Sequence, residues 1–352
     1  QSAGTRTATR PSTRIAVAST CAAGARARTA PAATVRVAPA NSAGRRRRRR
    51  AMGTGRGAMA HLCSAATATR ARSLKRTGAP AARRRAVTAG SGGDFTALNT
   101  EERKQVIGAV AKIAAGKIPT IASVQSTDIR VTIELSQFCE EVGIDAVQMS
   151  GAYYYDGRPQ DVIDWVEEVA RHTSVGFAAY SHWYSGSKYD MTMDVAEEIL
   201  KVPNTVAVKW GSPNIANYLA GFKYFVPRAA VVNNGPLSVY GHQLGVKAWV
   251  SHVPNFYPQH SWAVHDLMSA GQYEEAERVL DDFNDEYNEI RGMITSQTAG
   301  EGVFVKPFMK EMGRPSGPSR LPSRDEAVSQ EVRDRIRGLM KRAPSIVESA
   351  GV

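Results

Sequence analysis

Acidic residues are absent from the first 93 positions of this chain, although 33 aspartates and glutamates follow. The same stretch carries 19 arginines and one lysine, including the run Arg45–Arg50. The formal net charge of +12 therefore conceals two parts of opposite charge. After position 93 the chain has only 25 of its 45 basic residues but all 33 of its acidic residues. This distribution indicates an acidic globular part behind an arginine-rich leader.

Large apolar residues are scarce in residues 1–85, so this segment cannot offset the entropy lost on ordering, and we predict that it is disordered. Three interpretations stay open. An arginine-rich, acid-poor segment is typical of an organelle transit peptide, which would place the protein in a plastid or mitochondrion and not in the cytoplasm. A basic arm for nucleic acid is the second, although the segment lacks interleaved aromatic residues for base stacking. An out-of-frame translation of GC-rich DNA is the third.

Cysteine is also rare, with only Cys21, Cys63 and Cys139 in the chain. No Cys-x-x-Cys or cysteine/histidine ligand spacing occurs, so neither a disulfide framework nor a metal site is predicted. Apolar runs are short as well, because none approaches the ~18 residues that a membrane-spanning helix requires.

From Ala86 onward, strand-like runs alternate with helical patterns, which is typical of a parallel sheet built from βαβ units. The expected strands are 86–90, 118–124, 145–149, 175–180, 205–209, 229–233 and 247–250. The expected helices are 100–115, 129–142, 160–172, 193–201, 260–270, 273–294 and 326–342. We predict an α/β chain with a (β/α)8 TIM barrel over residues 86–258, its first strand missing or obscured, and a C-terminal helical extension over residues 259–352.

Two of these strands end in reactive side chains, Tyr180 and Lys209. The carboxyl ends of barrel strands form the active-site floor, and apolar surroundings favour the neutral form of an amine. A neutral lysine attacks carbonyl carbons and forms a Schiff base. The structural alternative is a lysine that ends a strand and points into water, as most lysines do.

Five ordered motifs resemble the dihydrodipicolinate synthase/N-acetylneuraminate lyase superfamily of Schiff-base aldolases. Gly90-Ser-Gly-Gly-Asp-Phe-Thr-Ala-Leu-Asn-Thr-Glu-Glu-Arg103 is similar to the family's GxxGE segment, and Gly151-Ala-Tyr-Tyr-Tyr155 with the following Arg-Pro-Gln to its PYY segment. Tyr180 and Lys209 match the tyrosine and lysine that end its fifth and sixth strands. The late stretch Val305–Gly313 with Leu321-Pro322 is similar to its VK…LP stretch.

The resemblance implies that Lys209 forms an imine with pyruvate or a related 2-oxo acid, without a cofactor or metal ion. It implies a proton relay of Tyr180, Ser91 and Tyr154, with Tyr154 supplied across a subunit interface of a homo-oligomer, a dimer or a tetramer. The alternative for the tyrosines around Tyr154 is packing at that interface alone.

Gly90, Gly92 and Gly93 allow close approach of the backbone, and exposed N–H groups there are expected to hold the substrate carboxylate. The alternative is that these glycines serve only the conformation of a turn. The synthases' arginine is absent after Tyr180, where Lys188 offers charge without a planar fork. A role in lysine biosynthesis is therefore not favoured. Asn233 and Ser251 occupy positions after later strands where specificity residues lie, and His252 is expected to be a polar pocket or loop residue.

These observations predict a class I lyase that carries out aldol cleavage or condensation through an imine. A sugar-acid dehydratase on the same machinery is the enzymatic alternative. A catalytically inactive barrel is a second alternative, because a barrel without its first strand would expose sheet edges and wet the lysine. Nucleic-acid binding through the leader is a third.

Overall fold

The computed structural model describes residues 86–114, 117–151, 153–154, 157–181, 191–298, 304–349 and 351. The chain divides into two units, Gln1–Met52 and Gly53–Val352, and every described residue belongs to the second. The predicted disordered leader and the expected first strand lie outside the described residues, as does Lys188.

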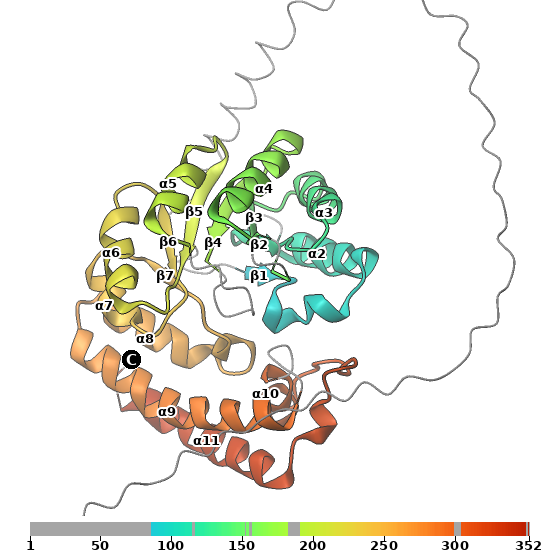
Figure 1. Ribbon diagram of the computed structural model, residues 1–352. Helices are drawn as coiled ribbons and strands as arrows, with labels where there is room; N and C mark the ends of the chain where they lie inside the picture. The colour runs from blue at the N-terminus through green and yellow to red at the C-terminus, as the bar shows by residue number, and fades with distance from the viewer. Residues whose placement is uncertain are drawn as a thin grey trace, which may run out of the picture. The chain divides into compact units, whose positions relative to one another are not determined.

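The described chain contains one parallel sheet of seven strands in sequential order, curled as in a TIM barrel (Figure 1). The strands are β1 Ala86–Thr88, β2 Thr120–Ser123, β3 Ala146–Met149, β4 Gly176–Tyr180, β5 Thr205–Trp210, β6 Ala230–Asn233 and β7 Ala248–Trp249. All seven coincide with predicted strands, and the barrel-like fold class is confirmed. Within the described residues β1 and β7 are the two edges of the sheet.

Helices connect the strands and continue beyond the last of them. They are α2 Thr100–Ala114, α3 Ile129–Glu141, α4 Pro159–His172, α5 Met193–Lys201, α6 Ile215–Phe225, α7 Ser238–Gln243, α8 Pro258–Ser269, α9 Tyr273–Gln297, α10 Val305–Glu311 and α11 Gln330–Glu348. Short 3₁₀ turns occur at Ser91–Gly93, Phe95–Ala97, Val253–Asn255 and Asp325–Ala327. Helices α6, α7 and α10 were not among the predicted helices. Helices α7 and α10 have only six and seven residues, which are too few to show a periodic pattern.

Helix starts follow local capping chemistry. The Asn99 side chain accepts the Glu102 N–H at 2.9 Å, and the Glu102 carboxylate accepts the Asn99 N–H at 3.0 Å, so the predicted capping box is confirmed. The last helix begins at Gln330 instead of position 326, because the Ser329 hydroxyl caps it by accepting the Val332 N–H at 3.4 Å.

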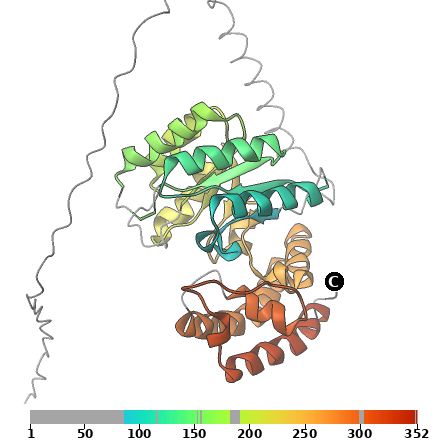
Figure 2. The same ribbon diagram turned by 90° about the vertical axis from the view of Figure 1, so that its right-hand side faces the viewer.

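Each face of the sheet packs against its own apolar cluster. The larger lies between the strands and the helices around them, which Figure 2 shows for the teal and green helices α2, α3 and α4. The smaller lies on the opposite face and consists of Ile121, Ala146, Ala178, Val206, Ala207 and Ala230. Alternate residues of a strand share a face, so the residues two positions after Ile121, Ala146, Ala178 and Ala207 point to this inner face as well.

The C-terminal helices have an apolar cluster of their own, which includes Phe283 and Ile290 of α9, Phe308 of α10, and Ile336 and Leu339 of α11. This cluster buries the faces that a helical extension must cover, and it confirms the helical character predicted for the end of the chain.

Candidate active site

Lys209 and Tyr180 lie side by side on the inner face of the sheet. They are register partners on β5 and β4, and their exposed fractions are 8% and 4%. The Lys209 Nζ lies 3.7 Å from the centre of the Tyr180 ring. The amine and the phenol are thus neighbours in a largely dry position, as the pattern of the strand ends predicted.

Two further polar side chains occupy the same inner layer. Ser123 and Gln148 are register partners on β2 and β3, both are buried, and the Gln148 amide Nε2 donates to the Ser123 Oγ at 2.5 Å. A Cβ on Gly90 would lie 3.0 Å from the Ser123 Oγ, so the glycine permits the close approach of its loop. Ser123 and Gln148 were not among the predicted site residues. The available signal was a polar residue near the carboxyl end of each of two mostly apolar strands.

The predicted carboxylate-binding turn forms a 3₁₀ turn over Ser91–Gly93, entered from Gly90. The Gly93 N–H donates to the Gly90 carbonyl at 2.9 Å, so this donor is already used within the turn. The first N–H groups of a helical turn have no carbonyl within the turn to bind. In this turn those groups belong to Ser91, which is half-buried, and to Gly92, which is exposed.

The turn is fastened at its far end by an ion pair. Asp94 adopts a left-handed conformation with φ of 59°, and its carboxylate lies 2.6 Å from the Lys306 Nζ. Both side chains are only 14% exposed. Lys306, on α10, also donates to the Pro318 carbonyl at 3.0 Å. Two of the motifs quoted above, 212 positions apart, therefore meet at one contact.

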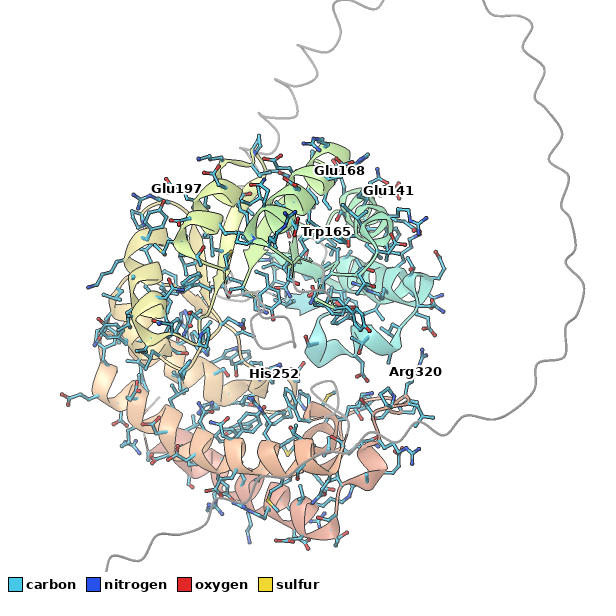
Figure 3. The ribbon with its side chains drawn as sticks, viewed as in Figure 1. Glu141, Trp165, Glu168, Glu197, His252 and Arg320 are labelled. Carbon is cyan, nitrogen blue, oxygen red and sulfur yellow. The ribbon has the colours of Figure 1, made fainter. Side chains whose placement is uncertain are left out.

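His252 lies between the turn and the C-terminal helices, as its label in Figure 3 shows. A Cβ on Gly92 would lie 3.0 Å from the His252 Cδ2 and 3.1 Å from its Nε2. Its ring meets the Phe304 ring edge to face, with 4.6 Å between the ring centres. Burial, together with the positive charges of Arg291 and Lys209, lowers the pKa of His252 to about 4, so the imidazole is neutral at pH 7.

Tyr153 and Tyr154, which follow β3, differ in their exposure. Tyr154 is 80% exposed. Tyr153 contacts Phe95 edge to face at 6.0 Å, and burial raises the pKa of its phenol. An exposed tyrosine beside a half-buried one is compatible with a residue that reaches a second subunit, and the relay role of Tyr154 stays a prediction.

Of the remaining predicted binding residues, Asn233 ends β6 and Ser251 follows β7. The Asn233 Oδ1 accepts hydrogen bonds from the Tyr218 hydroxyl at 2.5 Å and from the Gly235 N–H at 2.9 Å. The Ser251 hydroxyl accepts the Val253 N–H at 3.3 Å. Both side chains thus support their own loops, and their predicted contact with substrate stays a prediction.

No cluster of three or more histidine, cysteine, aspartate or glutamate side chains suited to a metal ion occurs in the described part of the chain. Among its helices, none combines the length and the apolarity that crossing a membrane requires.

Comparison with known proteins identifies a family whose model matches most of this chain. Residues 84–343 match the model of the dihydrodipicolinate synthetase family. The N-acetylneuraminate lyase of Rhizobium meliloti (strain 1021) is 26% identical over 238 residues, which cover 67% of this chain and 76% of that protein. The probable 5-dehydro-4-deoxyglucarate dehydratase 2 of Streptomyces avermitilis is 25% identical over 244 residues, covering 67% and 70%.

Solved structures show the same fold. The dihydrodipicolinate synthase of Acinetobacter baumannii, complexed with pyruvate, aligns with a TM-score of 0.65 at 20% identity and covers 80% of this chain and 92% of that one. The N-acetylneuraminate lyase of Mycoplasma synoviae aligns with a TM-score of 0.60 at 20% identity, with coverages of 80% and 92%.

Proposed function

Because the chain belongs to the dihydrodipicolinate synthetase family and is a lyase, we propose that it acts on a 2-oxo acid through a Schiff base on Lys209. One observation carries the proposal: the buried Lys209 Nζ lies against the Tyr180 ring, 3.7 Å from its centre. An amine in a closed, largely apolar position beside a phenol has the two groups that imine formation requires, a nucleophile and a proton carrier.

In the proposed reaction the neutral Lys209 Nζ attacks the carbonyl carbon of the oxo acid and forms a carbinolamine. The nitrogen loses a proton, the hydroxyl gains one, and water leaves as the C=N bond forms. Tyr180 carries these protons, with Ser91 of the turn and Tyr154 of a neighbouring subunit completing the relay. In the aldol cleavage the protonated imine then accepts the electron pair of the bond between the carbons α and β to it. That bond breaks, the hydroxyl on the β carbon loses its proton and becomes a carbonyl, and an enamine remains on Lys209.

The substrate carboxylate would bind at the turn that begins at Gly90. The leading N–H groups of Ser91 and Gly92 supply donors without charge, and their position at the start of a helical turn suits an anion. The Asp94–Lys306 ion pair holds the end of the turn, so the donors keep one orientation.

Two reaction types compete for the second half of the chemistry. One curated relative is named a lyase of N-acetylneuraminate and the other a dehydratase of a sugar acid. Both names describe hydroxylated 2-oxo acids, and the missing arginine after Tyr180 disfavours the synthase reaction. We therefore propose a hydroxylated 2-oxo acid as substrate, with carbon–carbon cleavage as the first candidate and water loss as the second.

Trapping with borohydride tests the proposal. The full chain is incubated with pyruvate and sodium borohydride, and peptides are mapped by mass spectrometry. We expect a reduced pyruvyl adduct on Lys209, no adduct in Lys209→Ala, and full labelling in Lys223→Ala, which changes a lysine of α6. Tyr180→Phe should slow adduct formation by ~100-fold, since a positioned proton carrier contributes about that much.

An unlabelled Lys209 in the wild-type chain at saturating pyruvate would overturn the proposal and favour a catalytically inactive barrel. When trapping succeeds, sugar-derived 2-oxo acids separate the two reaction types. Release of pyruvate from such an acid identifies aldol cleavage, whereas loss of water without pyruvate release identifies dehydration.

A further inference from the structure

The His252 ring lies directly beside Gly92. No left-handed backbone angle requires a glycine at position 92, but a Cβ there would lie 3.0 Å from the His252 ring. Real Cβ atoms rarely approach a neighbour so closely, and a ring wedged against Phe304 has little room to withdraw. The imidazole therefore occupies the space beside the turn that a side chain at position 92 would fill.

The surroundings of His252 suit an anionic ligand. Arg291, whose guanidinium carbon lies 5.2 Å from the centre of the Phe304 ring, places positive charge near the imidazole. Neither ring nitrogen has a hydrogen-bond partner among the described residues, although the side chain is only partly exposed. A neutral imidazole carries one N–H donor and one acceptor, and a polar ring in such a place is normally hydrogen-bonded.

We propose that His252 is a substrate-contacting residue whose ring N–H donates to the carboxylate of the 2-oxo acid held at the Gly90–Gly93 turn. This inference rests on the proposed function and adds to it a specificity-determining side chain from the loop after β7. The turn supplies backbone donors from one side and His252 supplies a side-chain donor from the other. The neutral state of the ring keeps its lone pair available, so the second nitrogen accepts a hydrogen bond from water or from a substrate hydroxyl.

The test compares His252→Ala, His252→Asn, Gly92→Ser and the double variant Gly92→Ser/His252→Ala, in the full chain, by borohydride trapping of pyruvate on Lys209. His252→Ala should raise the half-saturating pyruvate concentration by ~10-fold or more, the usual loss for a hydrogen bond to a charged group. His252→Asn, which keeps an N–H donor, should recover part of that loss. Trapping of acetone, which has no carboxylate, should be impaired less than trapping of pyruvate in His252→Ala and in Gly92→Ser.

Gly92→Ser should be as impaired as His252→Ala, because its Cβ displaces the ring. The double variant should return to within ~3-fold of wild type, since the serine hydroxyl then fills the vacated space and offers a donor; such non-additivity is expected only of neighbours. A merely structural His252 would lower the thermal midpoint and leave the half-saturating pyruvate concentration unchanged, or would affect pyruvate and acetone equally. Either result would overturn the inference.

A second measurement separates this inference from the Schiff-base proposal. Equilibrium binding of radiolabelled pyruvate to Lys209→Ala and to Lys209→Ala/His252→Ala does not depend on the imine. Weaker binding in the double variant would support the His252 contact even if the wild type formed no adduct on Lys209. Equal binding in the two variants would contradict the contact, whatever the trapping experiment shows.

Discussion

Lys306 acts on the site from a distance, through a single contact with Asp94. Asp94 ends the Gly90–Gly93 turn in a left-handed conformation, which aspartate tolerates better than most residues but which still costs free energy. The carboxylate is held by the Lys306 Nζ at 2.6 Å, in a position where both side chains are 14% exposed. Lys306 of α10 thus holds the end of the turn whose N–H groups are proposed to bind the substrate carboxylate.

We expect Lys306→Met to lower the free energy of unfolding by about 2 kcal/mol, because it leaves a partly buried carboxylate without its partner. The half-saturating pyruvate concentration in borohydride trapping should rise by ~10-fold, with a smaller change in the maximal rate. Arg320→Gln is the matched control, since Arg320 bonds Glu102 at 2.7 Å with the two side chains 48% and 31% exposed. Such an exposed pair contributes little to stability. Equal effects of the two variants would contradict a special role for Lys306.

At the scale of elements, the packing of α6 on β5 orients Lys209. Trp210 is fully buried and follows Lys209 directly, so the two side chains point to opposite faces of the sheet. The Trp210 indole donates to the Tyr218 carbonyl at 2.9 Å and lies against Gly221 of α6. Because Lys209 and Trp210 are consecutive residues of β5, the packing that fixes the Trp210 indole on the outer face also fixes the backbone from which the Lys209 amine extends on the inner face.

Two helix glycines give a matched test of this packing by urea denaturation. A Cβ on Gly221 would lie 2.2 Å from the Trp210 Cε2, so Gly221→Ala should lower the free energy of unfolding by about 3 kcal/mol through overpacking. A Cβ on Gly108 of α2 would lie 3.6 Å from the Phe138 Cζ, an ordinary contact. Gly108→Ala should therefore raise the free energy of unfolding by about 0.5–1 kcal/mol through helix propensity. A neutral Gly221→Ala would show that Trp210 is not confined as described.

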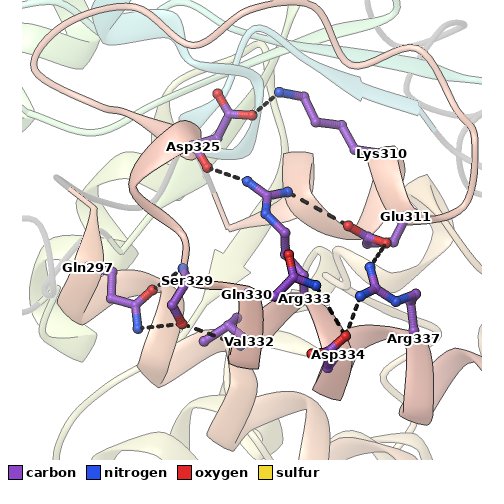
Figure 4. Close-up of polar contacts among 10 residues, drawn as sticks. All are labelled: Gln297, Lys310, Glu311, Asp325, Ser329, Gln330, Val332, Arg333, Asp334 and Arg337. Atoms are coloured by element: carbon purple, nitrogen blue, oxygen red, sulfur yellow. Dashed lines mark hydrogen bonds and ion pairs between the residues drawn. The ribbon is translucent and has the colours of Figure 1, made fainter.

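At the scale of the whole molecule, a polar network ties the C-terminal helices together (Figure 4). Asp325 is fully buried, its carboxylate pairs with Lys310 of α10, and its carbonyl accepts from the Arg333 guanidinium of α11 at 3.1 Å. Burial alone would raise the pKa of Asp325, but pairing with Lys310 and hydrogen bonds that include one from Ser319 together outweigh burial, and the pKa is lowered. A buried carboxylate is thus kept charged between two helices.

This network makes stability depend on pH. A carboxyl whose folded pKa is depressed contributes stability above its unfolded pKa of about 3.9, and that contribution is lost as the pH falls through the folded pKa. In Lys310→Met burial is no longer opposed by pairing with that lysine, so the folded pKa of Asp325 should rise and acid should favour the folded state. We expect the variant to be about 2 kcal/mol less stable at pH 7, a discounted value because Lys310 is 39% exposed.

The difference in stability between wild type and Lys310→Met should shrink as the pH falls from 7 to 3, measured by urea denaturation at each pH. Asp325→Asn removes the titrating group, and its stability should change less than that of the wild type below pH 4. A wild-type–variant difference that stays constant across this range would show that Asp325 is not the group responsible.

Residue patterns alone predicted the seven strands, the capping box at Asn99 and the adjacency of Tyr180 and Lys209. These features are local or periodic: alternate strand residues share a face, and successive parallel strands bring their carboxyl ends to one edge. The motifs around Gly90 and Lys306 were likewise visible in the sequence, although nothing in their spacing showed that they touch.

Only the tertiary structure decided the contacts between distant segments: Asp94 with Lys306, Gly92 with His252, and Gln148 with Ser123. The tertiary structure also shows that the Asn233 Oδ1, predicted to contact substrate, accepts a hydrogen bond from the Tyr218 hydroxyl. Periodicity reports which face a side chain shares with its neighbours along the chain. Which partner it meets across that face depends on how segments far apart in the sequence fold together at one edge of the sheet, and no local pattern carries that information.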